Sequence, residues 1–340
     1  MKTLFRTGLT ILAAGAGAAT AQAANVTGAG SSFVAPVMAR WSADYNKVTG
    51  DQINYQPNGS GAGIAGIKAG TIDFGASDQP LGSAELAQAG LVQFPVVVGG
   101  ILPVVNIAGV APGKLNFTGA LLADVFLGRV TMWNDAAIAH ANPGVKLPAA
   151  AIVVAHRADS SGTTFNLTHY LGQVSPAWKS GPGEGKDVKW PAGSLGGKGN
   201  AGVAQIVKQT SNSIGYVEYA YVVENKMTYA LVANVEGKYP TPNAASFQAA
   251  ASRAPWERAS DFNLVMTNAP GPNAWPITAS TFVLVHKHPA ADKAVNAAAA
   301  LKFFHWALSK GQPEAAALNY VALPPALVQR IDSYLAANVK

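Results

Sequence analysis

Hydrophobic positions along the chain alternate between two periods. Every fourth residue from Phe33 to Tyr45 is apolar, which predicts a helix with one buried face. Segments 151–156 and 280–286 are instead short, mostly apolar runs rich in β-branched residues, which is typical of buried strands. Because helical and strand patterns alternate along the chain, we expect an α/β fold with largely parallel sheets.

The same periods place the remaining elements. We expect further strands in 53–56, 71–77 and 213–219, and helices in 64–67, 120–128, 165–171, 203–209 and 292–311, with a last helix that carries Leu327, Ile331, Tyr334 and Leu335. The apolar segment 94–107 suggests a crossover between two lobes, broken by Gly99 and Gly100, and 263–278 suggests the return. Two such crossovers would form a hinge and make the first lobe discontinuous.

Length supports this division, because one hydrophobic core rarely serves 340 residues. We assign residues 24–100 to the first part of lobe I, 101–266 to lobe II and 267–340 to the second part of lobe I. Residues 1–23 resemble a cleaved secretory signal, with a basic start, a short apolar stretch and Ala21 and Ala23 at the cleavage site. The alternative is a retained membrane anchor, but the apolar stretch is short and contains glycines.

Composition narrows the function classes. Apolar residues make up 49% and charged residues 12%, with 35 glycines and 21 prolines, as in a packed chain with many turns. The absence of cysteine excludes disulfides, thiolate metal sites, cysteine nucleophiles and a lipoprotein tether. The mature chain keeps 22 basic and 18 acidic residues, a net charge of +4. Its basic residues are scattered, which argues against nucleic acid and is compatible with a small anion.

Three segments share one arrangement, in which small and hydroxylated residues precede a helix start. They are 28–33 (GAGSSF), 58–63 (NGSGAG) and 157–165 (RADSSGTTF). Unpaired N–H groups at helix N-termini attract anions, glycine allows close approach, and hydroxyls add donors. For each segment alone, ordinary helix capping is the favoured explanation. Three together, one of them with an arginine, favour a shared anion site.

Enzymatic alternatives find less support. Residues 61–66 (GAGIAG) match a dinucleotide-binding pattern, and Asp78 lies near the spacing of a ribose-binding acid, but a glycine-rich chain produces this pattern readily. Neither Ser60 nor Ser161 lies in the G-x-S-x-G context of a hydrolase nucleophile. The histidines, including His286 and His288, form no zinc motif. We therefore expect no catalytic residue, no metal and no cofactor.

The motifs GAGSSFVAPVMARW, DFGASDQPL, RADSSGTTF, GGKGN, IGYVEYAY and WPITASTFVLVHK occur in this order. With them the chain resembles the periplasmic phosphate-binding proteins of bacterial ABC phosphate importers, from about Val26 to the C-terminus. The resemblance implies a two-lobed periplasmic binding protein fold of type II. Each lobe would be a mixed, mostly parallel sheet flanked by helices, with the anion buried between the lobes.

The resemblance also implies the residues that bind phosphate. Arg157 would donate its guanidinium fork to the anion while Asp159 holds it, and Asp78 would accept a proton from the ligand. Phe33 would contribute its backbone N–H. The full set is Ser32, Phe33, Ser60, Asp78, Arg157, Asp159, Ser161, Gly162 and Thr163. The sequence departs from the family pattern at Ser32, where threonine is usual, at Ser160, where glycine is frequent, and at Gly61, where serine is common.

The implied function is capture of phosphate in the periplasm by a monomer, without catalysis, and delivery to the permease and ATPase of an inner-membrane ABC importer. One alternative is a binding protein for another oxyanion, such as sulfate, molybdate or a phosphonate. Asp78 and Asp159 argue against sulfate, which has no proton to donate at neutral pH. The other alternative is an exported phosphoester hydrolase, for which the sequence offers neither a nucleophile beside a base nor a pair of metal sites.

Overall fold

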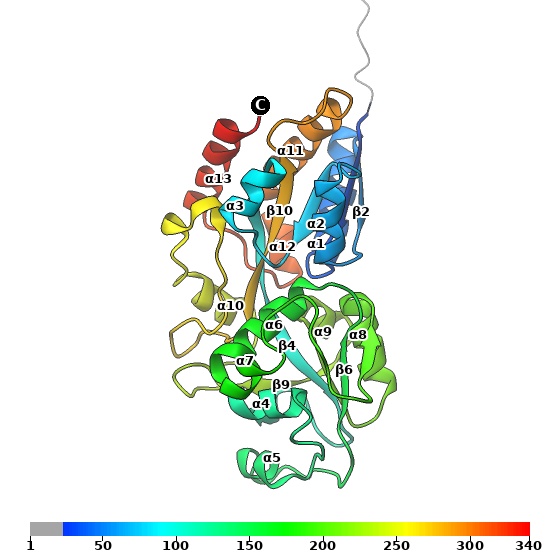
Figure 1. Cartoon of the computed structure of the whole chain (residues 1–340), viewed down its shortest axis with the longest axis vertical. Coiled ribbons are helices and arrows are strands. Elements are labelled where there is room, and N and C mark those ends of the chain that lie inside the picture. The colour runs from blue at the N-terminus through cyan, green and yellow to red at the C-terminus, as the bar shows by residue number, and fades with distance from the viewer. Residues whose placement is uncertain (1–22) are drawn as a thin grey trace, which may run out of the picture.

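The computed structural model describes residues 23–340, so the predicted signal lies outside the described residues except for Ala23. The strands form one curved sheet in the order β2-β1-β3-β10-β4-β8-β6-β7, with β9 beside β4 and β5 beside β9 (Figure 1). They are β1 (Asn25–Gly30), β2 (Gln52–Gln56), β3 (Phe74–Ser77), β4 (Leu91–Asn106), β5 (Leu115–Phe117), β6 (Val153–Arg157), β7 (Leu195–Gly197), β8 (Ser213–Glu218), β9 (Thr228–Val232) and β10 (Thr278–His286).

Helices lie on both sides of this sheet (Figure 1). They are α1 (Ala35–Thr49), α2 (Ser60–Lys68), α3 (Ser83–Ala89), α4 (Gly119–Phe126), α5 (Ala136–Ala141), α6 (Gly162–Val174), α7 (Pro176–Ser180), α8 (Gly199–Gln209), α9 (Tyr219–Glu224), α10 (Ala244–Ala251), α11 (Ala294–Ser309), α12 (Gln312–Ala317) and α13 (Pro325–Asn338), with short 3-10 turns at Trp256–Arg258 and Ser260–Phe262. Within residues 23–340, no helix combines the length and apolarity needed to cross a membrane.

The predicted α/β fold is confirmed, but the centre of the sheet is antiparallel. Strand β1 pairs in parallel with β2 and β3, and β6 pairs in parallel with β7 and β8, as the sequence predicted. Strand β10 is antiparallel to β3 and β4, and β4 is antiparallel to β8. The reason is that β4 and β10 carry the chain between the two halves of the molecule in opposite directions.

Strand β4 corrects the expectation of a break at Gly99 and Gly100. It continues for 16 residues through both glycines, pairing with β10 up to Gly100 and with β8 from Ile101 onward. A Cβ at Gly99 would lie 2.9 Å from the Phe33 ring, and one at Gly100 would overlap the Phe247 ring. The glycines therefore allow close packing of two aromatic rings instead of ending the strand.

The return segment lies beside this strand. Ile101 donates its N–H to the carbonyl of Ile277 (2.9 Å), and the indole N–H of Trp275 donates to the carbonyl of Ile101 (3.0 Å). The register of β10 against β4 shifts between Thr281 and Phe282. Pro95, which has no N–H to donate, lies at this bulge opposite Phe282.

Helix α1 illustrates how the sequence specifies the elements next to the site. Val37, Trp41 and Tyr45 form its buried face, as their spacing predicted. A proline occupies the first turn, where its missing N–H costs no helical bond. Gly50 ends the helix with φ of 82°, a left-handed conformation that glycine adopts without strain. The start of α1 is thereby fixed directly after the segment 28–33.

Candidate functional site

The three hydroxyl-rich segments lie next to helix starts, as predicted. Residues 28–33 connect β1 to α1, α2 begins at Ser60, and α6 begins at Gly162. Ser161 caps α6, since its hydroxyl oxygen accepts from the N–H of Thr164 (3.1 Å). The capping interpretation therefore holds for Ser161, whose own proton remains available for a further hydrogen bond.

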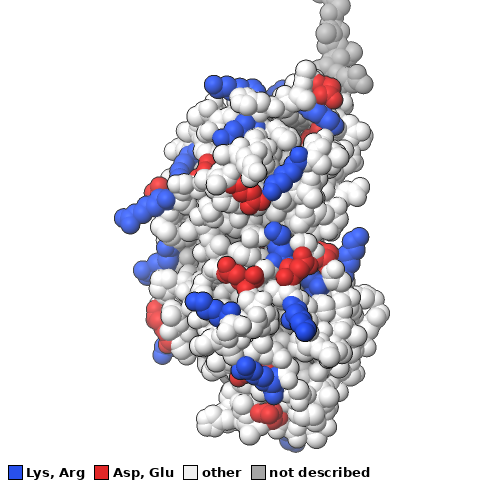
Figure 2. All heavy atoms as spheres, in the orientation of Figure 1, with Lys and Arg blue, Asp and Glu red and all other residues white. Residues whose placement is uncertain are grey.

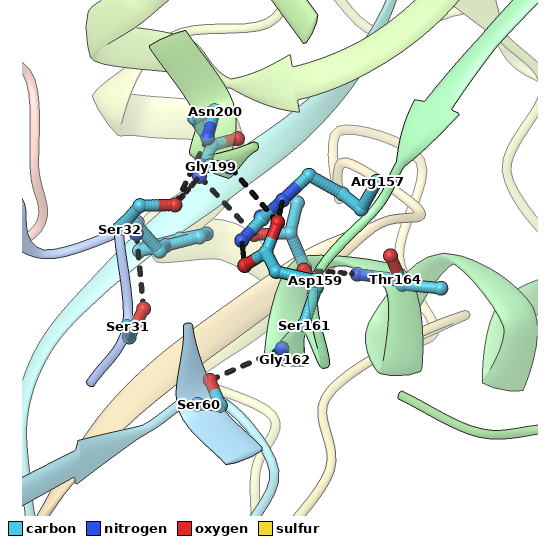
Figure 3. Close-up of polar contacts among 12 residues, drawn as sticks. Ser31, Ser32, Ser60, Arg157, Asp159, Ser161, Gly162, Thr164, Gly199 and Asn200 are labelled. Carbon is cyan, nitrogen blue, oxygen red and sulfur yellow. Dashed lines mark hydrogen bonds and ion pairs between the residues drawn. The ribbon is translucent and has the colours of Figure 1, made fainter. Parts of the chain in front are cut away.

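The three segments also come together in space (Figure 3). The hydroxyl oxygen of Ser60 accepts from the N–H of Gly162 (3.1 Å) and from the N–H of Asp78 (3.2 Å). The hydroxyl oxygen of Ser32 accepts from the backbone N–H and the side-chain amide of Asn200 (3.0 and 2.9 Å). These bonds join parts of the chain that are 102 and 168 residues apart. The structure thus gathers the hydroxyls into one buried cluster.

Arg157 supplies a cation to this cluster. It ends strand β6, and only 1% of its side-chain surface is exposed. Its Nε donates to one carboxylate oxygen of Asp159 (2.8 Å) and its Nη2 to the other, while Nη1 lies 3.4 Å from the hydroxyl of Thr163. Gly199 also donates its N–H to Asp159 (2.9 Å). The carboxylate therefore fixes the orientation of the guanidinium plane.

The carboxyl groups of Asp159 and Asp78 have opposite pKa shifts. For Asp159, burial raises the pKa, but hydrogen bonding and charge attraction from Arg157 outweigh burial and hold it below the usual range. For Asp78, burial dominates and raises the pKa to about 6, although hydrogen bonds from Ser31 and Thr281 and the charge of Arg157 oppose the shift. The surroundings thus favour the charged form of the Asp159 carboxyl, whereas burial favours the protonated form of the Asp78 carboxyl.

The environment of Asp78 leaves room for a ligand proton. Its Oδ1 accepts from the hydroxyls of Ser31 (2.5 Å) and Thr281 (2.7 Å). The side-chain amide of Asn166 donates to its backbone carbonyl (2.7 Å). Both of these hydroxyl bonds reach the same oxygen, so Oδ2 is the oxygen that can accept from a ligand.

Phe33 has two backbone contacts. Its N–H, the donor implied by the family resemblance, donates to the hydroxyl of Ser31 (2.9 Å). Its carbonyl accepts from the hydroxyl of Tyr320 (2.7 Å). The structure therefore places this N–H in the cluster but engages it with a neighbouring side chain.

Sequence reasoning missed several residues of the cluster. Asn200 lies in the motif GGKGN and Thr281 in STFVLVH, which were singled out for resemblance but given no role. Ser31 directly precedes Ser32, a predicted ligand residue. The hydroxyl of Tyr320, which donates to the Phe33 carbonyl, also lies 3.2 Å from the Glu218 carboxyl. Burial raises the pKa of Glu218 well above its ordinary value. The available signal was a polar residue inside an apolar strand, as Thr281 is, or at the end of a glycine-rich segment, as Asn200 is.

The two loop departures from the family pattern are in contact. A Cβ at Gly61 would lie 2.5 Å from the Cβ of Ser160, so the Ser160 side chain occupies the space that a larger residue at 61 would need. The N–H of Gly61 donates to the carbonyl of Ser160 (3.0 Å). The departures are thus reciprocal, since a small residue on one segment accommodates a larger residue on the other.

The glycine motif at 61–66 has a packing role. All three of its glycines lie within α2, which already begins at Ser60. A Cβ at Gly63 would lie 2.7 Å from the carbonyl oxygen of Ala29, because the helix packs directly on strand β1. This close approach accounts for Gly63 without a dinucleotide.

Two of the histidines line a surface pocket that contains none of the cluster residues. His286 ends β10 and lines a surface pocket with His288, Asp73 and Lys293. Among residues 23–340, no three histidine or acidic side chains are grouped in a way that could hold a metal ion.

Comparison with known proteins identifies the family. The family model described as PBP superfamily domain matches residues 15–310. The chain is 55% identical over 315 residues to the phosphate-binding protein PstS of Xylella fastidiosa, covering 93% of this chain and 86% of the relative. It is 47% identical over 320 residues to PstS of Haemophilus influenzae, covering 94% and 95%.

Solved structures with low sequence identity share the fold. The high-affinity periplasmic phosphate-binding protein PfluDING, solved with phosphate, has a TM-score of 0.68 at 19% identity and covers 91% of this chain and 93% of its own. The phosphate-binding protein of Stenotrophomonas maltophilia has a TM-score of 0.65 at 18% identity, with coverage of 92% and 94%. Together with the two close relatives, this agreement shows that the chain belongs to the PstS family of phosphate-binding proteins within the PBP superfamily.

Proposed function

We propose that this protein binds inorganic phosphate between two lobes and delivers it to the permease and ATPase of an ABC importer in the inner membrane. The observation that carries the proposal is the buried cluster around Arg157, in which hydroxyls and N–H groups surround a guanidinium beside the carboxyl of Asp78. Such a site suits an oxyanion that accepts many hydrogen bonds and donates one. The names of the PstS relatives favour phosphate among the oxyanions.

The ligand residues are proposed as the resemblance implied them. Arg157, the hydroxyls and the helix starts donate to phosphate, and Asp78 accepts from it. For Phe33 to bind phosphate, its N–H must release the hydroxyl of Ser31 and donate to the ligand instead. The proposed set is Ser32, Phe33, Ser60, Asp78, Arg157, Asp159, Ser161, Gly162 and Thr163.

Two lobes are proposed to close around the ion, with residues 24–100 and 267–340 in one and 101–266 in the other. Contacts between them support a closed state. The ammonium of Lys186 donates to the side-chain carbonyl of Gln79 (2.7 Å), and Asn166 donates to Asp78. Strand β4 and the segment leading into β10 are the connections about which such lobes rotate.

Export, the monomeric state and binding without catalysis belong to the same proposal. Cleavage near Ala24 would release the protein into the periplasm, where import of phosphate begins. On the face drawn in Figure 2, basic and acidic side chains are interspersed on a mostly uncharged surface. This distribution supports a small-molecule ligand over nucleic acid.

Calorimetric titration tests the proposal. The mature chain is unfolded to remove bound ligand, refolded and titrated with phosphate, sulfate, molybdate and methylphosphonate. We expect tight binding of phosphate alone. Absence of heat with phosphate, or tighter binding of another anion, would overturn the proposed ligand. Release of phosphate from a phosphoester by the same preparation would overturn the proposal of binding without catalysis.

A further inference from the structure

Asn200 is the second residue of α8 and has no exposed surface. Its side-chain carbonyl accepts from the N–H of Glu218 (3.0 Å). The two hydrogens of its amide nitrogen are donated to the hydroxyl oxygens of Ser32 (2.9 Å) and Thr163 (3.3 Å). Asn200 therefore connects two proposed ligand residues from opposite lobes. Its contact with Ser32 is drawn in Figure 3.

These contacts determine what the two hydroxyls can still do. A hydroxyl has two lone pairs and one proton. The oxygen of Ser32 receives the backbone N–H and the side-chain amide of Asn200, which fill both lone pairs. The oxygen of Thr163 receives Asn200 and the Nη1 of Arg157 (3.4 Å). Each hydroxyl retains only its proton, which it can donate to a ligand.

Ser60 reaches the same state without Asn200. Its oxygen accepts from the N–H groups of Asp78 and Gly162. By contrast, Asp78 keeps Oδ2 as an acceptor, because the hydroxyl bonds from Ser31 and Thr281 both reach Oδ1. The cluster thus faces a ligand with three hydroxyls restricted to donation, the hydroxyl of Ser161, whose oxygen accepts from the N–H of Thr164 and keeps one lone pair, and one carboxyl acceptor.

We propose that Asn200 is a positioning residue that restricts the hydroxyls of Ser32 and Thr163 to donation, and thereby favours the phosphate form with one proton, which Asp78 receives. A second ligand proton would face the donating hydroxyls of Ser32, Ser60 and Thr163 and find no acceptor among these three. Such a mismatch is costly in a buried site. This inference rests on the proposed binding of phosphate.

Removal of the amide makes the prediction specific. In Asn200→Ala, one lone pair on each hydroxyl becomes free, so the hydroxyls can accept the second proton of dihydrogen phosphate. At pH values above the second pKa of phosphate, we expect the phosphate affinity of Asn200→Ala to be about 10- to 100-fold lower than that of the wild type. This loss corresponds to one or two misdirected hydrogen bonds. On the acidic side the loss should shrink several-fold.

Other charged and titratable groups face the same cluster. They are common to the wild type and Asn200→Ala, so the ratio of the two phosphate affinities at each pH largely removes their contribution. They are Arg157 and Asp159 from the β6–α6 segment, Asp78 after β3, Tyr55 on β2, Tyr216 and Glu218 on β8, Tyr221 on α9 and Tyr320 before α13.

The experiment compares phosphate binding by calorimetry at one mildly alkaline and one mildly acidic pH. Asn142→Ala is the matched control, because Asn142 is a buried amide of lobe II that makes three hydrogen bonds with Asn116 and Ile138, outside the cluster. The control should retain wild-type affinity at both pH values. An equal loss for Asn200→Ala at both pH values, or a loss below twofold, would overturn the inference.

A second variant keeps the test decisive if alanine prevents folding. Asn200→Asp has nearly the same shape, but its carboxylate draws the protons of Ser32 and Thr163 away from the ligand until it is protonated. Its loss should therefore also shrink with acidification, and a pH-independent loss contradicts the inference. If the wild-type protein itself binds no phosphate, the proposed function fails. If it binds and both Asn200 variants keep its pH dependence, only the role of Asn200 fails.

Discussion

Substitution of Gly61 by serine tests whether the segments around Ser60 and Ser160 meet when phosphate binds. Gly61 lies in the first turn of α2, and Ser160 directly precedes Ser161, the N-cap residue of α6. A Cβ at Gly61 would lie 2.5 Å from the Ser160 Cβ and 3.5 Å from its carbonyl oxygen. The first distance is far below a van der Waals contact, so one segment must move away from the other.

The expected loss of phosphate affinity in Gly61→Ser follows from the position of this contact. Overpacking of a filled site costs about 1–3 kcal/mol. Since the two segments belong to different proposed lobes, the cost falls on the closed state, and an open state avoids it. Phosphate affinity should therefore fall by about 5- to 150-fold. The melting temperature of the phosphate-free protein should change little.

A double-mutant cycle isolates the contact. Ser160→Gly removes the obstructing side chain, so Gly61→Ser combined with Ser160→Gly should recover most of the affinity, with a coupling energy of about 1–3 kcal/mol. Calorimetry of the four proteins measures it. Gly172→Ser on α6 is the control, because a Cβ there meets open space. Binding by Gly61→Ser within twofold of wild type, or no recovery in the double variant, would refute the reasoning.

Four further predictions concern charge, selectivity, pH and shape. Arg157→Ala should weaken phosphate binding by about 2–5 kcal/mol, or at least 30-fold. Lys68→Ala should have little effect, because Lys68 forms a surface ion pair with Glu85. Similar losses of phosphate affinity for the two variants in calorimetry would contradict the site. Asp78→Asn should narrow the preference for phosphate over sulfate by admitting sulfate, and an unchanged ratio in competition titrations of the folded variant rules out Asp78 as the selective residue. Burial raises the pKa of Asp78 from 3.8 to about 6, so between these values this group holds more protons in the folded state than in the unfolded state. The contribution of Asp78 to the stability of the phosphate-free wild type should therefore decrease by about 3 kcal/mol as pH rises through this window, and thermal melts should show a steeper loss in the wild type than in Asp78→Asn. Small-angle scattering should give a smaller radius of gyration with phosphate than without, and identical profiles from verified ligand-free protein would contradict lobe closure.

Much of the fold could be predicted because its elements carry strong local patterns. Val37, Trp41 and Tyr45 are four residues apart and so specify one helix face. The apolar run 151–156 covers most of strand β6. The continuous path of β4 could not be predicted, because glycine usually weakens a strand. Only the three-dimensional packing of Phe33 and Phe247 shows why glycine is required there.

The residues of the site that lie at helix starts could be predicted from the sequence. Hydroxyls and glycines next to a cap can be identified locally, and Arg157 lies in the same short segment as Ser161. Asn200 and Thr281 could not be assigned in this way, because they contact Ser32 and Asp78 across 168 and 203 residues of sequence. Separation along the chain holds no information about such contacts until the sheet topology is known.

The charges in the cluster show why hydrogen-bond direction matters more than charge. The one guanidinium, Arg157, is already paired with Asp159, and Asp78 adds a second carboxyl to the cluster, on whose pKa the charge of Arg157 acts. The site therefore offers little net positive charge to an anion with one or two negative charges. Binding must come largely from hydroxyls and N–H groups at the starts of α1, α2, α6 and α8, which carry partial positive charge. The Ser60 oxygen is fixed by bonds from Asp78 and Gly162, which belong to different proposed lobes. In the proposed closure, donors held in this way take their positions only when the two lobes meet. Discrimination then depends on where the ligand's proton lies, since the protein supplies donors on most sides and an acceptor at Asp78.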